Sequence, residues 1–256
     1  MENEILTLFK RCAEKVESEL RSLGSVDYGE TMGMGADGTP IKMIDERAES
    51  TVVNFIKEQT DFSILSEEIG FVEGDGEGTV ILDPIDGTSN AVMGIPFYCI
   101  SLAYTTGTLK DTKVGYVKNL STDVEYSGIS GEGSYMNGKA LKPVLDNEWN
   151  FSVYMGKKAH PDSFKVASEP RRVRSLGSAA LEISMVAQGI FDLYYMKTYK
   201  QRRSLRITDI AAAYVILKEV GGDIYDTNLD PIDMELDPKQ RKDVAAMHDD
   251  RILEVL

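Results

Sequence analysis

The chain has 256 residues, of which 42% are hydrophobic and 27% charged, as expected for an ordinary globular protein. The formal net charge of −14 disfavours binding to a nucleic-acid backbone or to an anionic membrane surface. No apolar run approaches the roughly 20 residues of a membrane-spanning helix. Cys12 and Cys99 lie far apart and form no CxxC or Cys/His cluster, which disfavours a disulfide framework or zinc site and favours the reducing cytoplasm.

Hydrophobic periodicity predicts helices and strands without a strict strand–helix–strand rhythm, which favours a layered α/β fold over a doubly wound sheet. The glycine-rich stretch 29–40 predicts a loop. In the first half we expect, in chain order, a helix over 2–23, a helix capped by Asp45 and ending near Gln59, strands over 62–66 and 79–83, a meander from 98 to 126 and a hairpin over 133–144 around Asn137-Gly138. In the second half we expect strands over 152–155 and 173–176, a helix over 178–188, a strand over 192–195 and a helix over 208–220. A polar surface loop over 226–239, a strand over 244–247 and a short helix over 252–256 complete the expected elements.

Acidic residues stand where several of these elements begin or end. Glu67 and Glu68 follow one predicted strand, Asp83 ends the next, Asp86 comes three residues later, and Asp209 opens an apolar helix. Each position also has an ordinary structural explanation. The string from Asp83 to Asp86 is good turn chemistry, the two glutamates could form a solvated face, and Asp209 is a suitable N-cap.

Taken together, the acidic residues favour a metal site. Several carboxylates are buried together only at great cost without a counter-charge, so a cation best explains their convergence. Mg²⁺ prefers oxygen ligands, usually a few carboxylates with substrate phosphate. Asp83 and Asp86 on one tight turn would flank the Ile85 carbonyl, another hard oxygen. Gly87 would let a phosphate approach backbone N–H groups, and the Thr88 hydroxyl could orient a water.

These motifs resemble those of the lithium-sensitive inositol monophosphatase superfamily, in order over nearly the whole chain. The segments 35–40 and 177–180 look most like the archaeal branch, whose members are often dual inositol monophosphatases and fructose-1,6-bisphosphatases. The other matching segments are Ser66-Glu67-Glu68, Asp83-Pro84-Ile85-Asp86-Gly87-Thr88, 208–213 and 219–222. The resemblance implies an α/β fold, the five-layered αβαβα sandwich of the sugar-phosphatase type, and a homodimer.

The resemblance also implies one phosphatase unit over 1–256, with the metal and water-activating residues mainly in 1–150 and the substrate-binding residues in 151–256. Two or three Mg²⁺ ions, with Mn²⁺ as a substitute, would bridge the substrate phosphate and an attacking water. The Asp37 loop would close over the site and help to hold a third metal. The implied metal ligands are Glu67, Asp83, Ile85, Asp86 and Asp209, the catalytic residues are Thr88, Asp45, Glu67 and Asp37, and the substrate-binding residues are Asp86, Gly87, Thr88, Arg174, Ala179 and Arg203.

The expected reaction is hydrolysis of small sugar or polyol phosphates, including inositol-1-phosphate and fructose-1,6-bisphosphate. By position, Arg174 and Arg203 resemble pocket residues of archaeal relatives and could pair with a second phosphate. The stretch 196–206 is longer than in those relatives, so either Arg203 or Arg206 could face the pocket. Ser89 and Thr208 replace the aromatic residues common in the family, and these departures concern substrate fit.

Two other functions remain open. A sister enzyme that hydrolyses 3′-phosphoadenosine phosphates or NADP would use the same metal chemistry on another substrate. A catalytically dead metal-binding or metabolite-binding protein could share the scaffold, although Glu67, Asp83, Asp86, Asp209 and Thr88 are all present. Phosphate release across a substrate panel distinguishes these functions.

Overall fold

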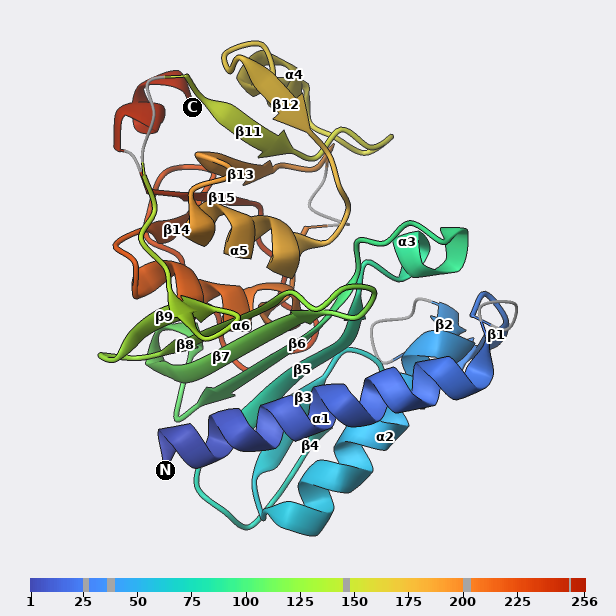
Figure 1. The fold of residues 1–256 in the computed structure, drawn as a ribbon. Coiled ribbons are helices and arrows are strands. Elements are labelled where there is room, and N and C mark those ends of the chain that lie inside the picture. Colours follow the sequence, from blue (N-terminus) through green and yellow to red (C-terminus); the bar gives the residue numbers. More distant parts are fainter. Residues whose placement is uncertain (25–27, 36–39, 145–147, 200–203, 249) are drawn as a thin grey trace.

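Two sheets organise the chain in the computed structural model, which describes residues 1–24, 28–35, 40–144, 148–199, 204–248 and 250–256 (Figure 1). The helices are α1 (Glu2–Leu23), α2 (Met43–Gln59), α3 (Thr88–Met93), α4 (Pro161–Val166), α5 (Ala179–Gln188) and α6 (Ile207–Lys218), with the 3₁₀ turns η1 (Leu109–Asp111) and η3 (Asp250–Val255). The strands are β1 (Thr31–Met34), β2 (Pro40–Lys42), β3 (Ser63–Ser66), β4 (Gly70–Val72), β5 (Thr79–Asp86), β6 (Cys99–Thr105), β7 (Thr112–Asn119), β8 (Glu125–Ile129), β9 (Gly133–Met136), β10 (Lys139–Ala140), β11 (Asn150–Val153), β12 (Arg172–Arg174), β13 (Leu193–Met196), β14 (Asp223–Asp226) and β15 (Val244–Met247).

Both sheets are mixed. The larger has the strand order β10-β9-β8-β7-β6-β5-β3-β4, and the smaller has the order β12-β11-β13-β15-β14. Most neighbours are antiparallel, but β3 runs parallel to β5, and β11 runs parallel to both β12 and β13. The parallel β3–β5 pair is important for the site, because parallel strands bring their carboxyl ends to the same edge of a sheet.

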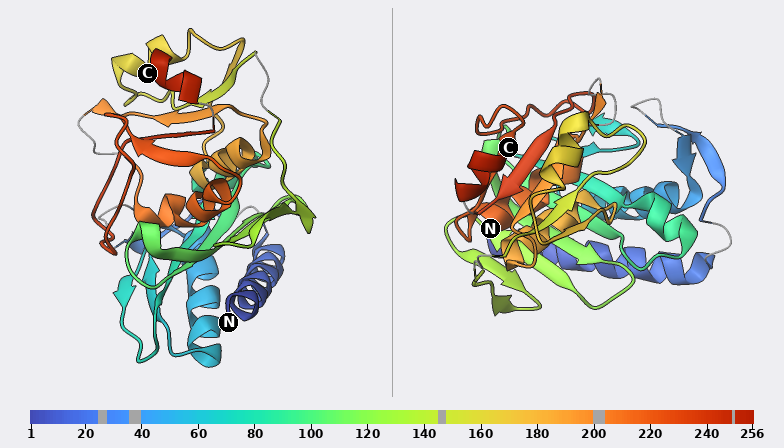
Figure 2. Two further views of the ribbon diagram at one scale, coloured as in Figure 1. Left: turned by 90° about the vertical axis from the view of Figure 1, so that its left-hand side faces the viewer. Right: turned by 90° about the horizontal axis from the view of Figure 1, so that it is seen from above.

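Helices and sheets alternate in five layers (Figures 1 and 2). Helices α1 and α2 cover the outer face of the larger sheet, and Phe9 and Ile56 share one buried cluster with Leu82. Helices α5 and α6 lie between the two sheets in a second cluster. On the far face of the smaller sheet, α4 and η3 bury Val166 and Ile252. The layered α/β class and the αβαβα sandwich are therefore confirmed.

Between its first and last turns, helix α6 is apolar on nearly every side, which suits its burial between the two sheets. It packs closely on β7, where a Cβ at Gly115 would collide with the carbonyl oxygen of Ala212. The glycine therefore allows the helix backbone to approach the strand. In the described part of the chain, no helix has both the length and the hydrophobicity needed to cross a membrane.

Several elements match the sequence-based expectations closely. The predicted hairpin at Asn137-Gly138 is confirmed: both residues have positive φ, 48° and 74°, as a two-residue type I′ turn requires. Helix α1 buries the expected apolar face, and α5 ends at Gly189 in the left-handed conformation. The meander between 98 and 126 is formed by β6, β7 and the start of β8.

Other expectations were wrong. Within the glycine-rich stretch, β1 pairs antiparallel with β2. All four residues of β1 are exposed, so β1 has no buried apolar face that would predict this strand. The segment 226–239 is not purely a surface loop, because Ile232 and Met234 are buried. The short elements α3, α4, β4 and β14 were not expected as such, and the last helix is a 3₁₀ turn.

Candidate active site

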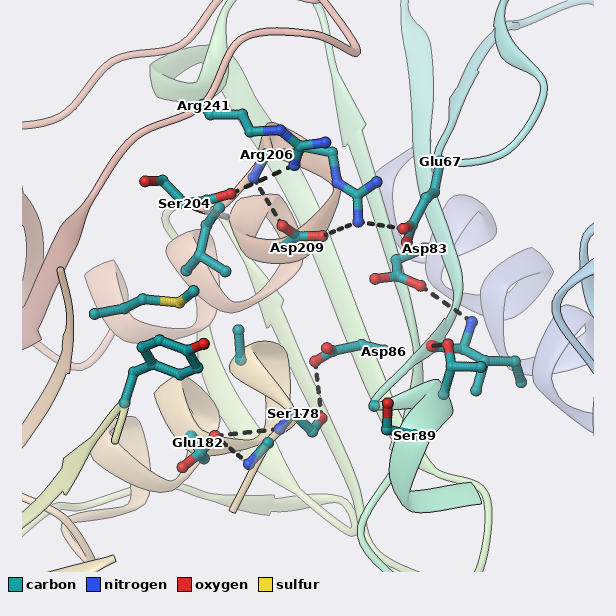
Figure 3. Close-up of a pocket in the computed structure, with 18 of the residues that line it drawn as sticks. Glu67, Asp83, Asp86, Ser89, Ser178, Glu182, Ser204, Arg206, Asp209 and Arg241 are labelled. Atoms are coloured by element: carbon teal, nitrogen blue, oxygen red, sulfur yellow. Dashed lines mark hydrogen bonds and ion pairs between the residues drawn. The ribbon is translucent and has the colours of Figure 1, made fainter. Parts of the chain in front are cut away.

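Three acidic side chains meet at the carboxyl ends of β3 and β5. In the β3–β5 register Ser66 pairs with Leu82, so Glu67 and Asp83 emerge side by side from the sheet. Asp209 reaches the same place from the first turn of α6. One carboxylate oxygen each from Glu67, Asp83 and Asp209 lies within 4.8 Å of the other two (Figure 3). The structure thus brings together three of the residues predicted as metal ligands.

The string from Asp83 to Asp86 is a bulged strand end and not the tight turn expected from the sequence. Strand β5 continues to Asp86, and its register against β6 shifts between Asp83 and Asp86. Pro84 lacks an N–H for the ladder, which is consistent with a bulge at this point. The Ile85 N–H donates to Asp83 Oδ1 at 3.1 Å. Both aspartates and the Ile85 residue between them line the same pocket.

Asp86 is also held by residues at the start of α5. Its Oδ2 accepts hydrogen bonds from Ser178 Oγ at 2.8 Å and from the Ala180 N–H at 2.7 Å. Burial and the neighbouring Asp209 carboxylate raise the pKa of Asp86 to about 7, although these two hydrogen bonds act in the opposite direction. Asp86 therefore connects the end of β5 with the segment that carries Ala179, a pocket-lining residue.

Asp45 and Asp209 occupy the same position, N3, in α2 and α6. Asp45 Oδ2 accepts the Lys42 N–H at 3.4 Å, and Asp209 Oδ2 accepts the Arg206 N–H at 2.7 Å. The N-caps are therefore Lys42 and Arg206, and the interpretation of both aspartates as N-caps was wrong. Because the helix terminus binds one oxygen of each aspartate, the other oxygen is available to the site.

The free oxygen of Asp45 meets the Thr88 hydroxyl. Thr88 Oγ lies 2.9 Å from Asp45 Oδ1 and 3.0 Å from the Ile85 carbonyl oxygen, and its single proton can be donated to only one of them at a time. Burial and the nearby Glu67 raise the pKa of Asp45 to about 7, against the opposing effect of the Thr88 hydrogen bond. Asp45 is thus suited to accept a proton near neutral pH.

The carboxylate cluster carries more negative charge than its protein neighbours balance. Burial and the charges of Glu67, Asp86 and Asp209 raise the pKa of Asp83 well above its usual range. Arg206 is the basic partner, in contact with Glu67 and 3.4 Å from Asp209 Oδ1. A set of hard oxygen donors with excess negative charge fits a divalent cation such as Mg²⁺.

The comparisons with known proteins agree with this geometry. A model of the inositol monophosphatase family matches residues 2–255. The chain belongs to this family. It is 38% identical over 255 residues to the fructose-1,6-bisphosphatase/inositol-1-monophosphatase of Methanothermobacter thermautotrophicus, with 92% of this chain and 89% of the relative covered.

This inositol monophosphatase family member is also similar to a second curated relative and to a solved structure. The bifunctional NADP phosphatase/NAD kinase of Methanococcus maripaludis is 32% identical, over 96% of this chain and 47% of the relative. A solved structure from Pyrococcus horikoshii, described as having similarities to inositol-1 monophosphatase, superposes with a TM-score of 0.86 at 27% identity. That match covers 100% of this chain and 97% of the other.

Two buried glutamates that the sequence interpretation missed support the site of this family member. Glu49 accepts the N–H groups of Glu68 and Ile69, each at 3.1 Å, and thereby holds the turn that carries Glu67. Glu182 does the same for the segment before α5. The sequence signal for these glutamates was an acidic residue on an otherwise apolar helix face. That signal does not by itself distinguish a buried glutamate from a solvated one.

Glu182 is buried and accepts three successive backbone N–H groups. Its Oε1 accepts from Leu176 at 2.9 Å, and its Oε2 accepts from Gly177 at 3.0 Å and Ser178 at 3.2 Å. Ser152 Oγ also contacts this carboxylate. Since Ser178 in turn bonds Asp86, Glu182 positions one of the predicted metal ligands through the backbone.

The acidic cluster opens into a pocket of ≈ 1160 Å³ whose basic lining residues differ from those expected. Arg174 is exposed on β12 and does not line the pocket, although the next residue, Ser175, does. Arg203 and Asp37 lie outside the described residues. Arg206 does face the pocket. The described basic residues that line it are Lys42, Lys158, Arg206 and Arg241.

The two departures from the family pattern lie in different environments. Ser89 lines the pocket, so its small side chain leaves space where an aromatic ring would project. Thr208 is 1% exposed inside α6 and is not among the described pocket-lining residues. Of the two, only Ser89 is placed to change substrate fit directly.

Proposed function

We propose that the chain is a Mg²⁺-dependent phosphatase that hydrolyses small sugar and polyol phosphates, including inositol-1-phosphate and fructose-1,6-bisphosphate. The observation that carries the proposal is the meeting of Glu67, Asp83 and Asp209 within 4.8 Å beside the Thr88–Asp45 pair. The relative that is 38% identical bears both activities in its name. We expect two or three Mg²⁺ ions, with Mn²⁺ as a substitute.

The side chains of this site suggest how water would be activated. Bound divalent cations would supply Lewis acidity toward the phosphoryl group. When Thr88 donates its proton to Asp45 and not to the Ile85 carbonyl, its oxygen lone pairs can accept a proton from the attacking water. As the water proton passes to Thr88 Oγ, the Thr88 proton passes to Asp45 Oδ1. The pKa of about 7 suits Asp45 for that role near neutral pH.

Substrate choice would depend on the basic wall of the pocket. Arg241 and Lys158 line it outside the acidic cluster and would pair with a second anionic group. Inositol-1-phosphate lacks such a group, whereas fructose-1,6-bisphosphate carries one. The division of labour between residues 1–150 and 151–256 is part of this proposal and is only approximate, because Asp209 belongs to the second half. The homodimer and the cytoplasmic location remain predictions.

Hydrolysis of NADP or 3′-phosphoadenosine phosphates is the second candidate. A pocket of ≈ 1160 Å³ is large for a monosaccharide phosphate and has room for part of a nucleotide. A relative that is 32% identical is named bifunctional NADP phosphatase/NAD kinase.

Phosphate release from a substrate panel tests the proposal. The purified chain would be assayed with inositol-1-phosphate, fructose-1,6-bisphosphate, NADP and 3′-phosphoadenosine-5′-phosphate, with Mg²⁺ and with EDTA. We expect Mg²⁺-dependent release that is fastest from a sugar or polyol phosphate. Highest kcat/KM for a nucleotide would favour the second candidate. Release that persists in EDTA, or no release from any substrate, would contradict the proposed function.

A further inference from the structure

Arg206 contacts two of the carboxylates that the proposed metals would use. Its Nη2 contacts Glu67 and lies 3.4 Å from Asp209 Oδ1 (Figure 3). The Arg206 side chain is only 12% exposed, and those of Glu67 and Asp209 are 17% and 7% exposed. The contact therefore lies inside the pocket wall, where solvent weakens it little.

The Arg206 guanidinium fits this place electrostatically. Burial alone would lower its pKa, but the charges of Asp209, Glu67 and Asp83 outweigh burial and raise the pKa above its usual value. The Arg206 charge in turn lowers the pKa of Asp83, against burial and the neighbouring carboxylates, which raise it. Arg206 thus neutralises part of the same negative charge that a divalent cation would neutralise.

The backbone of Arg206 is fixed independently of its side chain. The Arg206 N–H donates to Asp209 Oδ2 at 2.7 Å, which closes the first turn of α6. This bond involves the main chain and not the guanidinium, so it does not depend on the contacts that the guanidinium makes with Glu67 and Asp209 Oδ1.

We propose that the Arg206 side chain is a built-in competitor of the metals, which must displace its guanidinium from Glu67 and Asp209 in order to bind. Arg206 holds the carboxylates together in the absence of metal and weakens metal binding, because any cation held by both acids must take their oxygens from the guanidinium. The inference rests on the metal site of the proposed function, but it concerns metal affinity and not turnover.

Titration calorimetry of Mg²⁺ into EDTA-treated, dialysed protein tests the competition. Arg206→Gln removes the charge and retains a polar side chain. We expect it to bind Mg²⁺ about tenfold more tightly than the wild type, a change of about 1.4 kcal/mol. Without metal, Arg206→Gln should unfold at a lower temperature than the wild type, and Mg²⁺ should raise its Tm by more.

Arg241→Gln is the matched control. It removes one positive charge from the same pocket wall, where Arg241 Nη1 lies 3.4 Å from the Ser204 carbonyl oxygen (Figure 3). Its Mg²⁺ affinity should change less than about twofold, because long-range charge effects are weak in salt. If both variants bound Mg²⁺ more tightly by the same factor, the loss of any positive charge from the pocket would explain the effect. That result would overturn the proposal.

Arg206→Lys gives a second measurement if Arg206→Gln does not fold. Lysine keeps the charge but lacks the planar fork, so Mg²⁺ binding should be intermediate in strength. Unchanged or weaker Mg²⁺ binding in the folded Arg206 variants would overturn the inference while the proposed function stands. If the wild type itself bound no Mg²⁺, both the inference and the proposed function would fail.

Discussion

At the scale of single residues, each site aspartate has one oxygen bound to a nearby backbone N–H group. The four pairs of acceptor and donor are Asp83 with Ile85, Asp86 with Ala180, Asp45 with Lys42, and Asp209 with Arg206. A second oxygen on each side chain remains for the chemistry. Because glutamate is one methylene longer, we expect it not to keep both contacts.

Asp86→Asn should abolish hydrolysis and keep the fold. Asparagine can still accept from Ser178 and Ala180 through its carbonyl oxygen, but it loses the charge that attracts a cation. We expect kcat to fall by about 10³-fold or more. Phosphate release measures the loss, and circular dichroism checks the fold. A folded variant with wild-type turnover would contradict the role of Asp86.

Thr88→Val tests the proposed proton path. Valine has nearly the same shape but lacks the hydroxyl that bonds Asp45. General-base assistance contributes about 10²–10⁴-fold to a rate, so we expect kcat to fall within that range. Mg²⁺ affinity from calorimetry should stay close to that of the wild type. Thr88→Ser is the control, because it keeps the hydroxyl and should retain most activity.

Arg241→Ala tests recognition of a second anionic group. Arg241 lines the pocket, so its removal should raise KM for fructose-1,6-bisphosphate about tenfold while KM for inositol-1-phosphate changes little. Arg174→Ala is the control for charge, because Arg174 is exposed and does not line the pocket. A larger effect on bisphosphate turnover from Arg174 than from Arg241 would restore the sequence-based prediction.

At the scale of elements, the site is built where β3 and β5 and the first turns of α2, α5 and α6 converge. The strands supply Glu67, Asp83 and Asp86, and the helices supply Asp45 and Asp209. Buried glutamates fix the irregular segments between these elements by accepting their backbone N–H groups. Such buried acceptors are needed, because an unpaired buried N–H group costs about 1–3 kcal/mol.

Glu182→Ala should therefore destabilise the fold more than it changes the local chemistry. The substitution leaves the N–H groups of Leu176, Gly177 and Ser178 without their acceptor, so we expect a loss of about 2–4 kcal/mol. Urea denaturation monitored by circular dichroism gives the free energy of unfolding. The exposed Glu169→Ala is the control and should change it by less than about 0.5 kcal/mol. Equal stability of the two variants would contradict the role of Glu182.

At the scale of the whole molecule, the pocket concentrates negative charge, and buried charge without a counter-charge works against the fold. The net charge is −14, and the most strongly desolvated carboxylates gather in one pocket. The pKa values of Asp45 and Asp86 are raised to about 7, and that of Asp83 is raised well above its usual range. The folded protein therefore holds more protons than the unfolded chain between about pH 4 and pH 7.

Without metal, stability should fall as pH rises through this window. Raised pKa values of Asp45, Asp83 and Asp86 give stability that is present at low pH and lost as pH rises through the folded pKa. His248, whose pKa is lowered by burial, acts in the opposite direction up to about pH 6.5 but is a single group. In EDTA we expect a lower Tm at about pH 7.5 than at about pH 5.5.

Mg²⁺ should reverse that trend, because metal ligands bind in their deprotonated form. The Tm increase produced by Mg²⁺ should be larger at about pH 7.5 than at about pH 5.5. Differential scanning calorimetry at both pH values, with EDTA and with Mg²⁺, measures the four Tm values. A Tm in EDTA that rises with pH would contradict the raised pKa values.

Short-range patterns in the sequence were sufficient for the main elements and for most candidate ligands. The apolar spacing of residues 2–23 predicted α1, and Asn137-Gly138 predicted a hairpin, because helix and turn formation depend on neighbouring residues. The motif around Asp83 and Asp86, together with the other matching segments, indicated the family for the same reason. It is a continuous string whose chemistry can be interpreted without knowing the fold.

Only the tertiary structure determined how distant residues meet. The parallel β3–β5 pair and the burial of α6 place Glu67 beside Asp83 and Asp209, and they bring Arg206 to a carboxylate 139 residues away. Arg241 lines the pocket and Arg174 does not, although both belong to short stretches rich in basic residues. Sequence by itself determined the family and its acidic motif. Packing decided which charges face one another, because side-chain direction depends on register and burial over long chain separations.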